Sequence, residues 1–94
     1  MVSPSPTTIA TEILGLAGIH RKGSDYMVSS QDLCLKESAC RINDGDLGPG
    51  CFWAMRALSY SLGVFHPEYR RAADLARQVA EAEGIDPRLA GVRP

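Results

Sequence analysis

The stretch Gly50–Gly63 constrains the fold more than any other part of the chain, because it carries two apolar faces. Pro49 precedes it and Gly63 closes it, a pattern typical of a helix with an early proline and a left-handed glycine cap. Helical periodicity places one apolar stripe on Cys51, Ala54, Met55, Leu58 and Leu62. Trp53 and Tyr60 fall nearly opposite that stripe. Such a helix is either central in the fold or covered by a second chain on its other side.

A first helix is predicted over residues 7–22, where apolar side chains recur at helical spacing. Ser5 is the expected N-cap and Pro6 the first helical residue, while Gly23 follows as the stop. Gly15 and Gly18 each weaken a helix interior, so we interpret them as points where another helix could approach closely.

The last long helix is predicted over residues 67–83, from Pro67 to the glycine cap Gly84. Ile85 is placed to fold back over its last turn as in a Schellman cap, and Asp86 begins one more short turn through Leu89. The expected buried stripe consists mostly of small residues: Tyr69, Ala72, Ala73, Ala76, Val79 and Ala80.

The middle of the chain is less regular. We interpret residues 24–30 as a connector and residues 31–42 as a helix, continuous or broken, with a mixed apolar pattern. The eight residues 43–50 contain three glycines, one proline and two aspartates, which predicts a loop. Residues 1–5 and 91–94 are expected to be flexible.

Together these segments predict an all-α fold. A chain of 94 residues favours a single domain over residues 1–94, and its 45% apolar content is enough for one modest core. We expect a compact bundle of three to four helices, in which residues 51–62 pack against residues 7–22 and 67–83.

The amino terminus, the lack of a long apolar stretch and the cysteines indicate where the protein is located. The amino terminus has no basic region followed by an uninterrupted apolar run, and no stretch is long and apolar enough to span a membrane. We therefore expect a cytoplasmic protein with three free thiols, Cys34, Cys40 and Cys51, and no membrane partner.

No pattern predicts a metal or cofactor. The possible zinc ligands are widely spaced, with no Cys-x-x-Cys or His-x-x-x-His pair: Cys34, Cys40, Cys51, His20 and His66. The Asp44-Gly45-Asp46 loop does not follow the spacing of a calcium loop, so we interpret it as a turn whose aspartates cap backbone amides.

An enzyme is not expected either. Ser59, Ser61 and the cysteines lie in no nucleophile motif, and His66 is expected to be an N-cap or turn residue before Pro67.

Nucleic-acid binding is the alternative function that we retain. Two local basic clusters contain Arg21 with Lys22 and Arg70 with Arg71. The net charge is −1 and no helix carries a basic stripe, so a small helical DNA-binding regulator ranks second.

The preferred function is protein association, with a protein partner or with a second copy of the chain. Trp53 and Tyr60 lie seven residues apart on nearly one line, with Arg56 beside them. Tryptophan, tyrosine and arginine are the residues that dominate interface hot spots. The competing interpretation is that Trp53 packs inside its own chain, and the two differ in whether its ring is exposed in the monomer.

Overall fold

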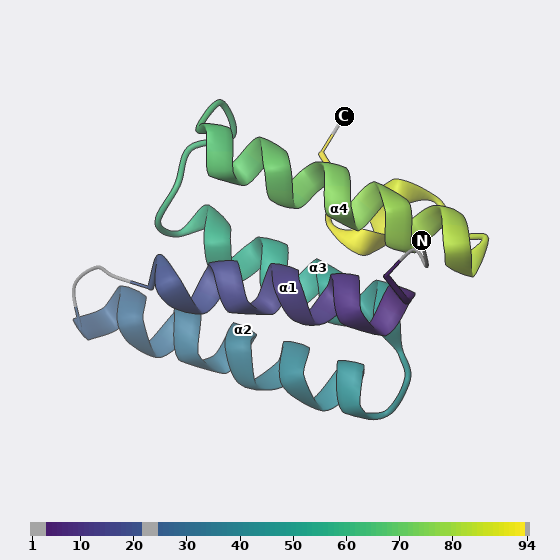
Figure 1. Cartoon of the computed structure of the whole chain (residues 1–94). Helices are drawn as coiled ribbons and strands as arrows, with labels where there is room; N and C mark the ends of the chain where they lie inside the picture. Colours follow the sequence, from purple (N-terminus) through teal and green to yellow (C-terminus); the bar gives the residue numbers. More distant parts are fainter. Residues whose placement is uncertain (1–3, 22–24, 94) are drawn as a thin grey trace.

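A computed structural model of the chain describes residues 4–21 and 25–93, without the side chains of residues 25–29. These residues form the four α-helices α1 (Pro6–Ile19), α2 (Asp25–Asn43), α3 (Leu47–Ser59) and α4 (Pro67–Glu83), and the short 3-10 helix η1 (Pro87–Ala90) (Figure 1). No strand occurs in these two ranges, so the prediction of an all-α bundle is confirmed.

Helix α3 lies at the centre of the bundle. It contacts all the other helices, whereas α2 and α4 lie on opposite sides and make no contact with each other in the described ranges (Figure 1). The predicted packing of this helix against α1 and α4 is confirmed. Helix α2 also packs along it, and this contact sets the geometry of the outer face of α3.

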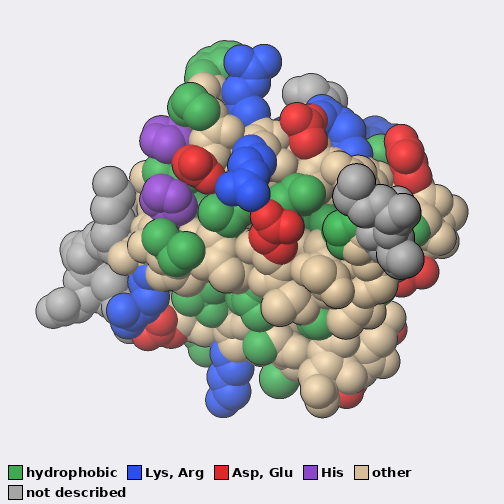
Figure 2. Space-filling view, in the orientation of Figure 1, with side chains coloured by type: hydrophobic (Ala, Val, Ile, Leu, Met, Phe, Trp, Pro, Cys, Tyr) green, Lys and Arg blue, Asp and Glu red, His purple; other side chains and the backbone are tan. Residues whose placement is uncertain are grey.

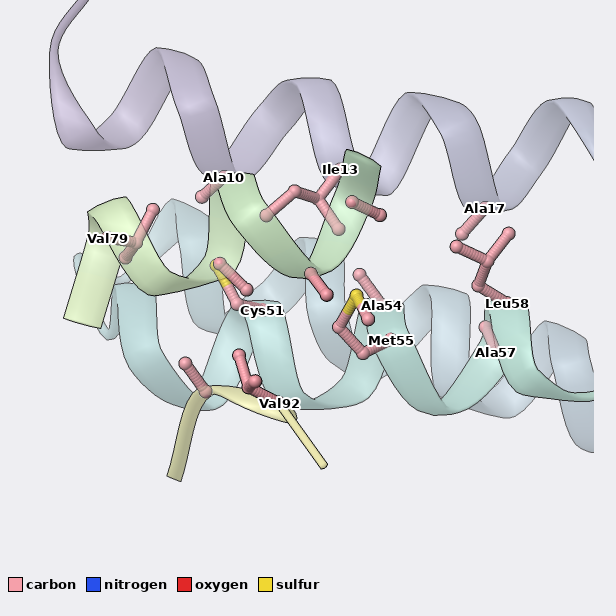
Figure 3. Packing of buried hydrophobic residues seen from close by; sticks show 14 of the residues in the cluster. Ala10, Ile13, Ala17, Cys51, Ala54, Met55, Ala57, Leu58, Val79 and Val92 are labelled. Carbon is pink, nitrogen blue, oxygen red and sulfur yellow. The ribbon is translucent and has the colours of Figure 1, made fainter. Parts of the chain in front are cut away.

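The core is built on the predicted stripe of residues 51–62, whose members are all buried, although Leu62 lies beyond the end of α3. Figure 3 shows Cys51, Ala54, Met55 and Leu58 of α3 facing the labelled side chains of α1 and α4. The predicted stripe of α4 is confirmed at all six positions. Most of its members are alanines, so the backbone of α4 can approach α1 and α3 closely.

The predicted N-caps of α1 and α4 and the glycine cap of α4 are also confirmed. The Ser5 hydroxyl accepts a hydrogen bond from the Thr8 amide at 3.2 Å, and the His66 imidazole accepts one from the Glu68 amide at 3.1 Å. Gly84 is left-handed at φ 68°, and the Ile85 amide donates to the Ala80 carbonyl at 3.0 Å, as a Schellman cap requires.

Helix α1 is shorter than predicted, because it ends at Ile19 with His20 as its C-cap. Arg21 leaves the helix and pairs with Asp32 of α2, with Nε 2.5 Å from Oδ1. Gly23, the expected stop, lies outside the described residues. The expected close approach at Gly15 and Gly18 is wrong, since a Cβ at either position would meet no atom within 4 Å.

Helix α2 is one continuous helix that begins at Asp25, so the predicted connector over residues 24–30 is wrong from that residue on. The apolar pattern of α2 is mixed because two of its buried side chains are polar. Gln31, Cys34 and Ser38 lie on one buried side. The Gln31 amide donates to the Ala57 carbonyl at 3.4 Å, and the Ser38 hydroxyl donates to the Gly50 carbonyl at 2.7 Å.

The predicted loop over residues 43–50 is only half correct, because α3 already begins at Leu47. Helix α2 ends at Asn43, and Gly45, at φ +85°, lies in the turn that follows it. Pro49 is tolerated because the amides of the first helical turn have no partner inside the helix. A Cβ at Gly50 would lie 2.6 Å from Cγ1 of Ile42, so the glycine permits the close contact between α2 and α3.

The far end of α3 also differs from the prediction. The helix ends at Ser59, and Tyr60 to Leu62 continue as turns. Gly63 is not the left-handed cap that we expected, because its φ is not positive.

The carboxyl-terminal segment closes one end of the core. The predicted short turn after Asp86 is present as η1, where the Asp86 carboxylate accepts from the Arg88 amide at 2.9 Å. Gly91 packs against α3, and a Cβ there would lie 2.8 Å from Cβ of Met55. Val92 is buried in the core, although residues 91–94 were expected to be flexible.

Candidate protein-interaction surface

The structure brings Trp53, Arg56 and Tyr60 together on the outer side of α3. They form one wall of a shallow groove of about 390 Å³ between α2 and α3. We call it the α3 groove, and it is lined by Ser30, Leu33, Cys34, Glu37, Trp53, Arg56 and Tyr60.

A second hollow of about 440 Å³ lies on the other side of Trp53. We call it the aromatic patch, and it is lined by Pro49, Phe52, Trp53, Ile85, Arg88 and Leu89. The rings of Phe52 and Trp53 meet edge to face, with centroids 5.5 Å apart and planes at 90°. The indole therefore forms a ridge between two hollows.

The large side chains around this ridge are unevenly covered. Trp53 and Tyr60 are half-buried and pack against the edge of the core, while Ala57 between them is buried. Helix α2 thus covers part of the side of α3 that lies opposite its core stripe. Leu33 remains 69% exposed, Leu89 61% and Phe52 37%. The Trp53 ring belongs partly to its own core and partly to the surface.

Three residues of this surface were missed from the sequence. Phe52 follows the stripe residue Cys51, and its position one turn before Arg56 was the signal that could have placed it beside Trp53. Leu33 and Leu89 come from α2 and η1, so no periodicity within α3 could have identified them.

Arg56 is the cation of this surface. It makes no ion pair with a carboxylate in the described ranges, and Glu37 across the groove is paired with Arg41 at 2.8 Å. Burial raises the pKa of the Cys34 thiol, and the nearby Arg56 guanidinium offsets part of that rise.

The candidate nucleic-acid residues do not form one basic surface of free cations. Arg21 is paired with Asp32, and Arg71 with Glu12 at 2.7 Å. Arg70 has no ion pair in the described part of the chain, and Lys22 lies outside it. Figure 2 shows acidic and basic side chains interspersed on the face that it presents.

The possible metal ligands are dispersed. Among the side chains that the structure describes, no three of His, Cys, Asp or Glu are grouped to hold a metal ion. Cys34 and Cys51 are buried, Cys40 is exposed, and all three are free thiols. Burial raises the pKa of the Cys51 thiol to about 12, so it is protonated and unreactive at neutral pH.

The two histidine rings lie near each other, with centroids 6.1 Å apart (Figure 2). His66 serves as the predicted N-cap of α4. The interpretation of the aspartates near Gly45 as side-chain caps is wrong for Asp46, which occupies the N-cap position of α3 without a side-chain hydrogen bond. The turn is closed by backbone bonds instead, from the Gly45 and Asp46 amides to carbonyls of α2.

Comparison of the chain with protein-family models, curated proteins and solved structures finds no match. Among the described residues, no helix has the length and apolar character that crossing a membrane requires.

Proposed function

We propose that the chain is a small non-catalytic interaction module that associates with a second copy of itself through the outer side of α3. The observation that carries the proposal is the Trp53 ridge between two hollows, flanked by exposed Phe52, Leu33 and Leu89. We further propose that it acts in the cytoplasm, where its three thiols stay reduced, without a metal or cofactor.

Apolar side chains from three elements, α2, α3 and η1, lie next to each other on this surface. Contiguous apolar surface on a small domain is typical of interaction sites, whereas single exposed apolar residues are ordinary. A two-fold dimer would cover the same patch on both copies at once. Arg56, which has no carboxylate partner among the described residues, can then lie over an aromatic ring of the other copy.

The test compares Trp53→Ala with Phe65→Ala by light scattering coupled to size exclusion. Phe65 is the matched control, an exposed aromatic residue that lines neither hollow. We expect a wild-type dimer at tens of micromolar, roughly the range for a modest interface. Phe65→Ala should remain dimeric, and Trp53→Ala should run as a folded monomer, since a central tryptophan contributes about 2 kcal/mol or more.

Because Trp53 also packs against the core, a second variant is needed. Leu33→Glu places a charge on an exposed position of the α3 groove and should give a folded monomer. A monomeric wild type, or a Leu33→Glu variant that stays dimeric, would contradict the proposed surface.

DNA binding ranks second as a function. Arg21 and Arg71 are held by carboxylates, so they would have to exchange those partners for phosphates. We expect no binding of duplex DNA at physiological salt. Sub-micromolar binding there that weakens steeply with added salt, and that is lost on replacing Arg70 and Arg71, would reverse the order.

A further inference from the structure

A separate hollow of about 470 Å³ lies beside α4, on residues that line neither the α3 groove nor the aromatic patch. We call it the arginine hollow. It is lined by Val64, Phe65, Tyr69, Arg70, Ala73, Asp74, Arg77 and Arg93. Its volume falls within the range of about 300–1,000 Å³ that small-molecule sites occupy.

The hollow is positively charged although the whole protein is slightly acidic. Three arginines and one aspartate line it. Asp74 is paired with Arg77 at 2.8 Å. Arg70 and Arg93 have no ion pair with any described residue. Two guanidinium groups are therefore available in one hollow, and guanidinium is the group best suited to bind carboxylate or phosphate.

Tyr69 adds a hydrogen-bond donor to the lining of the same hollow. Its side chain is only 4% exposed, and its hydroxyl makes no hydrogen bond within the described chain. Among the described residues, Glu68 Oε2 is the fully buried side-chain oxygen or nitrogen that has no hydrogen bond. The Tyr69 hydroxyl has no hydrogen bond to this part of the chain either but is not fully buried, so it keeps access to solvent. That access opens on the hollows that Tyr69 lines.

The neighbouring hollow extends the positive charge. It has a volume of about 280 Å³, shares Tyr69 and Arg93 with the arginine hollow, and adds Arg56 and Arg88 without any carboxylate in its lining. Arg88 is held by Asp86 at 2.9 Å, so its charge is largely compensated. Arg93 thus contributes to the walls of two hollows, and both favour an anion.

The rest of the wall is apolar. Phe65 is 86% exposed, and Val64 and Ala73 line the hollow with it. An exposed phenyl ring beside two free guanidinium groups matches a ligand that is charged at one end and flat and apolar at the other.

We propose that the arginine hollow binds a small aromatic anion, a carboxylate or a phosphate monoester. Arg70 and Arg93 hold its charged group, the Tyr69 hydroxyl donates a hydrogen bond to the same group, and the Phe65 ring packs against its aromatic part. The arginine hollow itself shares no described lining residue with the α3 groove or the aromatic patch.

The test is titration of the full chain with phenyl phosphate and with benzoate, followed by amide chemical shifts in NMR spectra. We expect saturable shifts at residues of the hollow. Arg70→Gln and Arg93→Gln should each weaken binding roughly tenfold, because each removes a charge-assisted hydrogen bond. Tyr69→Phe keeps the buried ring and should weaken binding about fivefold.

Arg71→Gln is the matched control. It removes the same charge at the adjacent position, but Arg71 points to Glu12 and does not line the hollow. Its affinity should stay within about twofold of the wild type, because the charge it removes is already paired and exposed. Equal losses for Arg70→Gln and Arg71→Gln would overturn the site in favour of nonspecific charge attraction.

The ligand class has its own controls. Inorganic phosphate should bind more weakly than phenyl phosphate, and benzyl alcohol should leave the hollow unshifted. Binding of benzyl alcohol as strong as that of phenyl phosphate would overturn the role of the arginines. The absence of saturable shifts with both aromatic anions would overturn the proposal as a whole. A monomeric wild type leaves these outcomes in place, because no described residue that lines the arginine hollow lines the α3 groove or the aromatic patch.

Discussion

Substitution of Gly50 by alanine tests how closely α2 and α3 must approach. Gly50→Ala adds a single methyl group in the first turns of α3. In an open helix position the same change stabilises by about 1 kcal/mol, because glycine loses more backbone freedom on folding. At Gly50 the new carbon would lie 2.6 Å from Cγ1 of Ile42 and 3.4 Å from its backbone nitrogen.

The clash outweighs the gain in helix propensity. Relaxing the contact with Ile42 to an ordinary carbon–carbon distance needs a shift of roughly 1 Å. Overpacking of this kind costs about 1–3 kcal/mol. The shift also stretches the bond from Ser38 to the Gly50 carbonyl, worth about 1 kcal/mol. With the propensity gain of about 1 kcal/mol subtracted, we expect a net loss of about 1–3 kcal/mol.

Urea and thermal unfolding, followed by circular dichroism, measure this loss. A loss of about 2 kcal/mol should lower the Tm by roughly 8–16 °C in a domain of this size. The matched control is Gly15→Ala, a helical glycine with open space around it, which should raise stability by about 1 kcal/mol. A Gly50→Ala variant as stable as the wild type would refute the tight contact between Gly50 and Ile42. When Gly50→Ala is combined with Ile42→Ala, the two losses of stability should not add, because the side chain that the new methyl group would clash with has been removed.

Three further predictions follow from the core, the thiols and the last turn. Val92→Ala should destabilise the fold by roughly 2 kcal/mol in urea unfolding, whereas a flexible end would leave stability unchanged. In the native state one thiol, Cys40, should react quickly with a thiol reagent, and three should react after denaturation; rapid reaction of Cys51 would contradict its burial. The Arg88 side chain holds the pKa of Asp86 at about 2, below its ordinary value of 3.8. The contact between Asp86 and Arg88 therefore stabilises the fold above about pH 4, and this contribution is lost as the pH falls from about 4 to about 2. Asp86→Asn should remove this part of the acid dependence measured by urea unfolding at each pH.

The parts of the fold that could be predicted are those whose buried side chains are apolar. Helix α4 was placed correctly because its buried residues recur at helical spacing and its ends carry a proline and a glycine. Helix α2 was placed only over residues 31–42, and its continuity was left open, because Gln31 and Ser38 occupy buried positions that an apolar pattern leaves blank. Their role becomes visible only when the backbone of α3 is there to accept their hydrogen bonds.

Tertiary contact also reversed the interpretation of Gly48 to Gly50. Two glycines and a proline predict a loop, but a helix forms there because Gly50 fits against Ile42. The residues that line the α3 groove and the aromatic patch could also be predicted only in part. Trp53, Arg56 and Tyr60 share one helix face and could be found, whereas Leu33 and Leu89 arrive from other elements.

The two polar contacts between α2 and α3 also restrict how these helices can slide. Apolar packing is non-directional, so a helix displaced along its neighbour by one turn, about 5.4 Å, can still bury similar area. Gln31 and Ser38, however, bind carbonyls near opposite ends of α3, and such a displacement would break both bonds at once. A buried side-chain amide or hydroxyl left without a partner is costly, so the shifted alignments are disfavoured. These two hydrogen bonds therefore favour one register between α2 and α3, in addition to the close packing of Gly50 against Ile42.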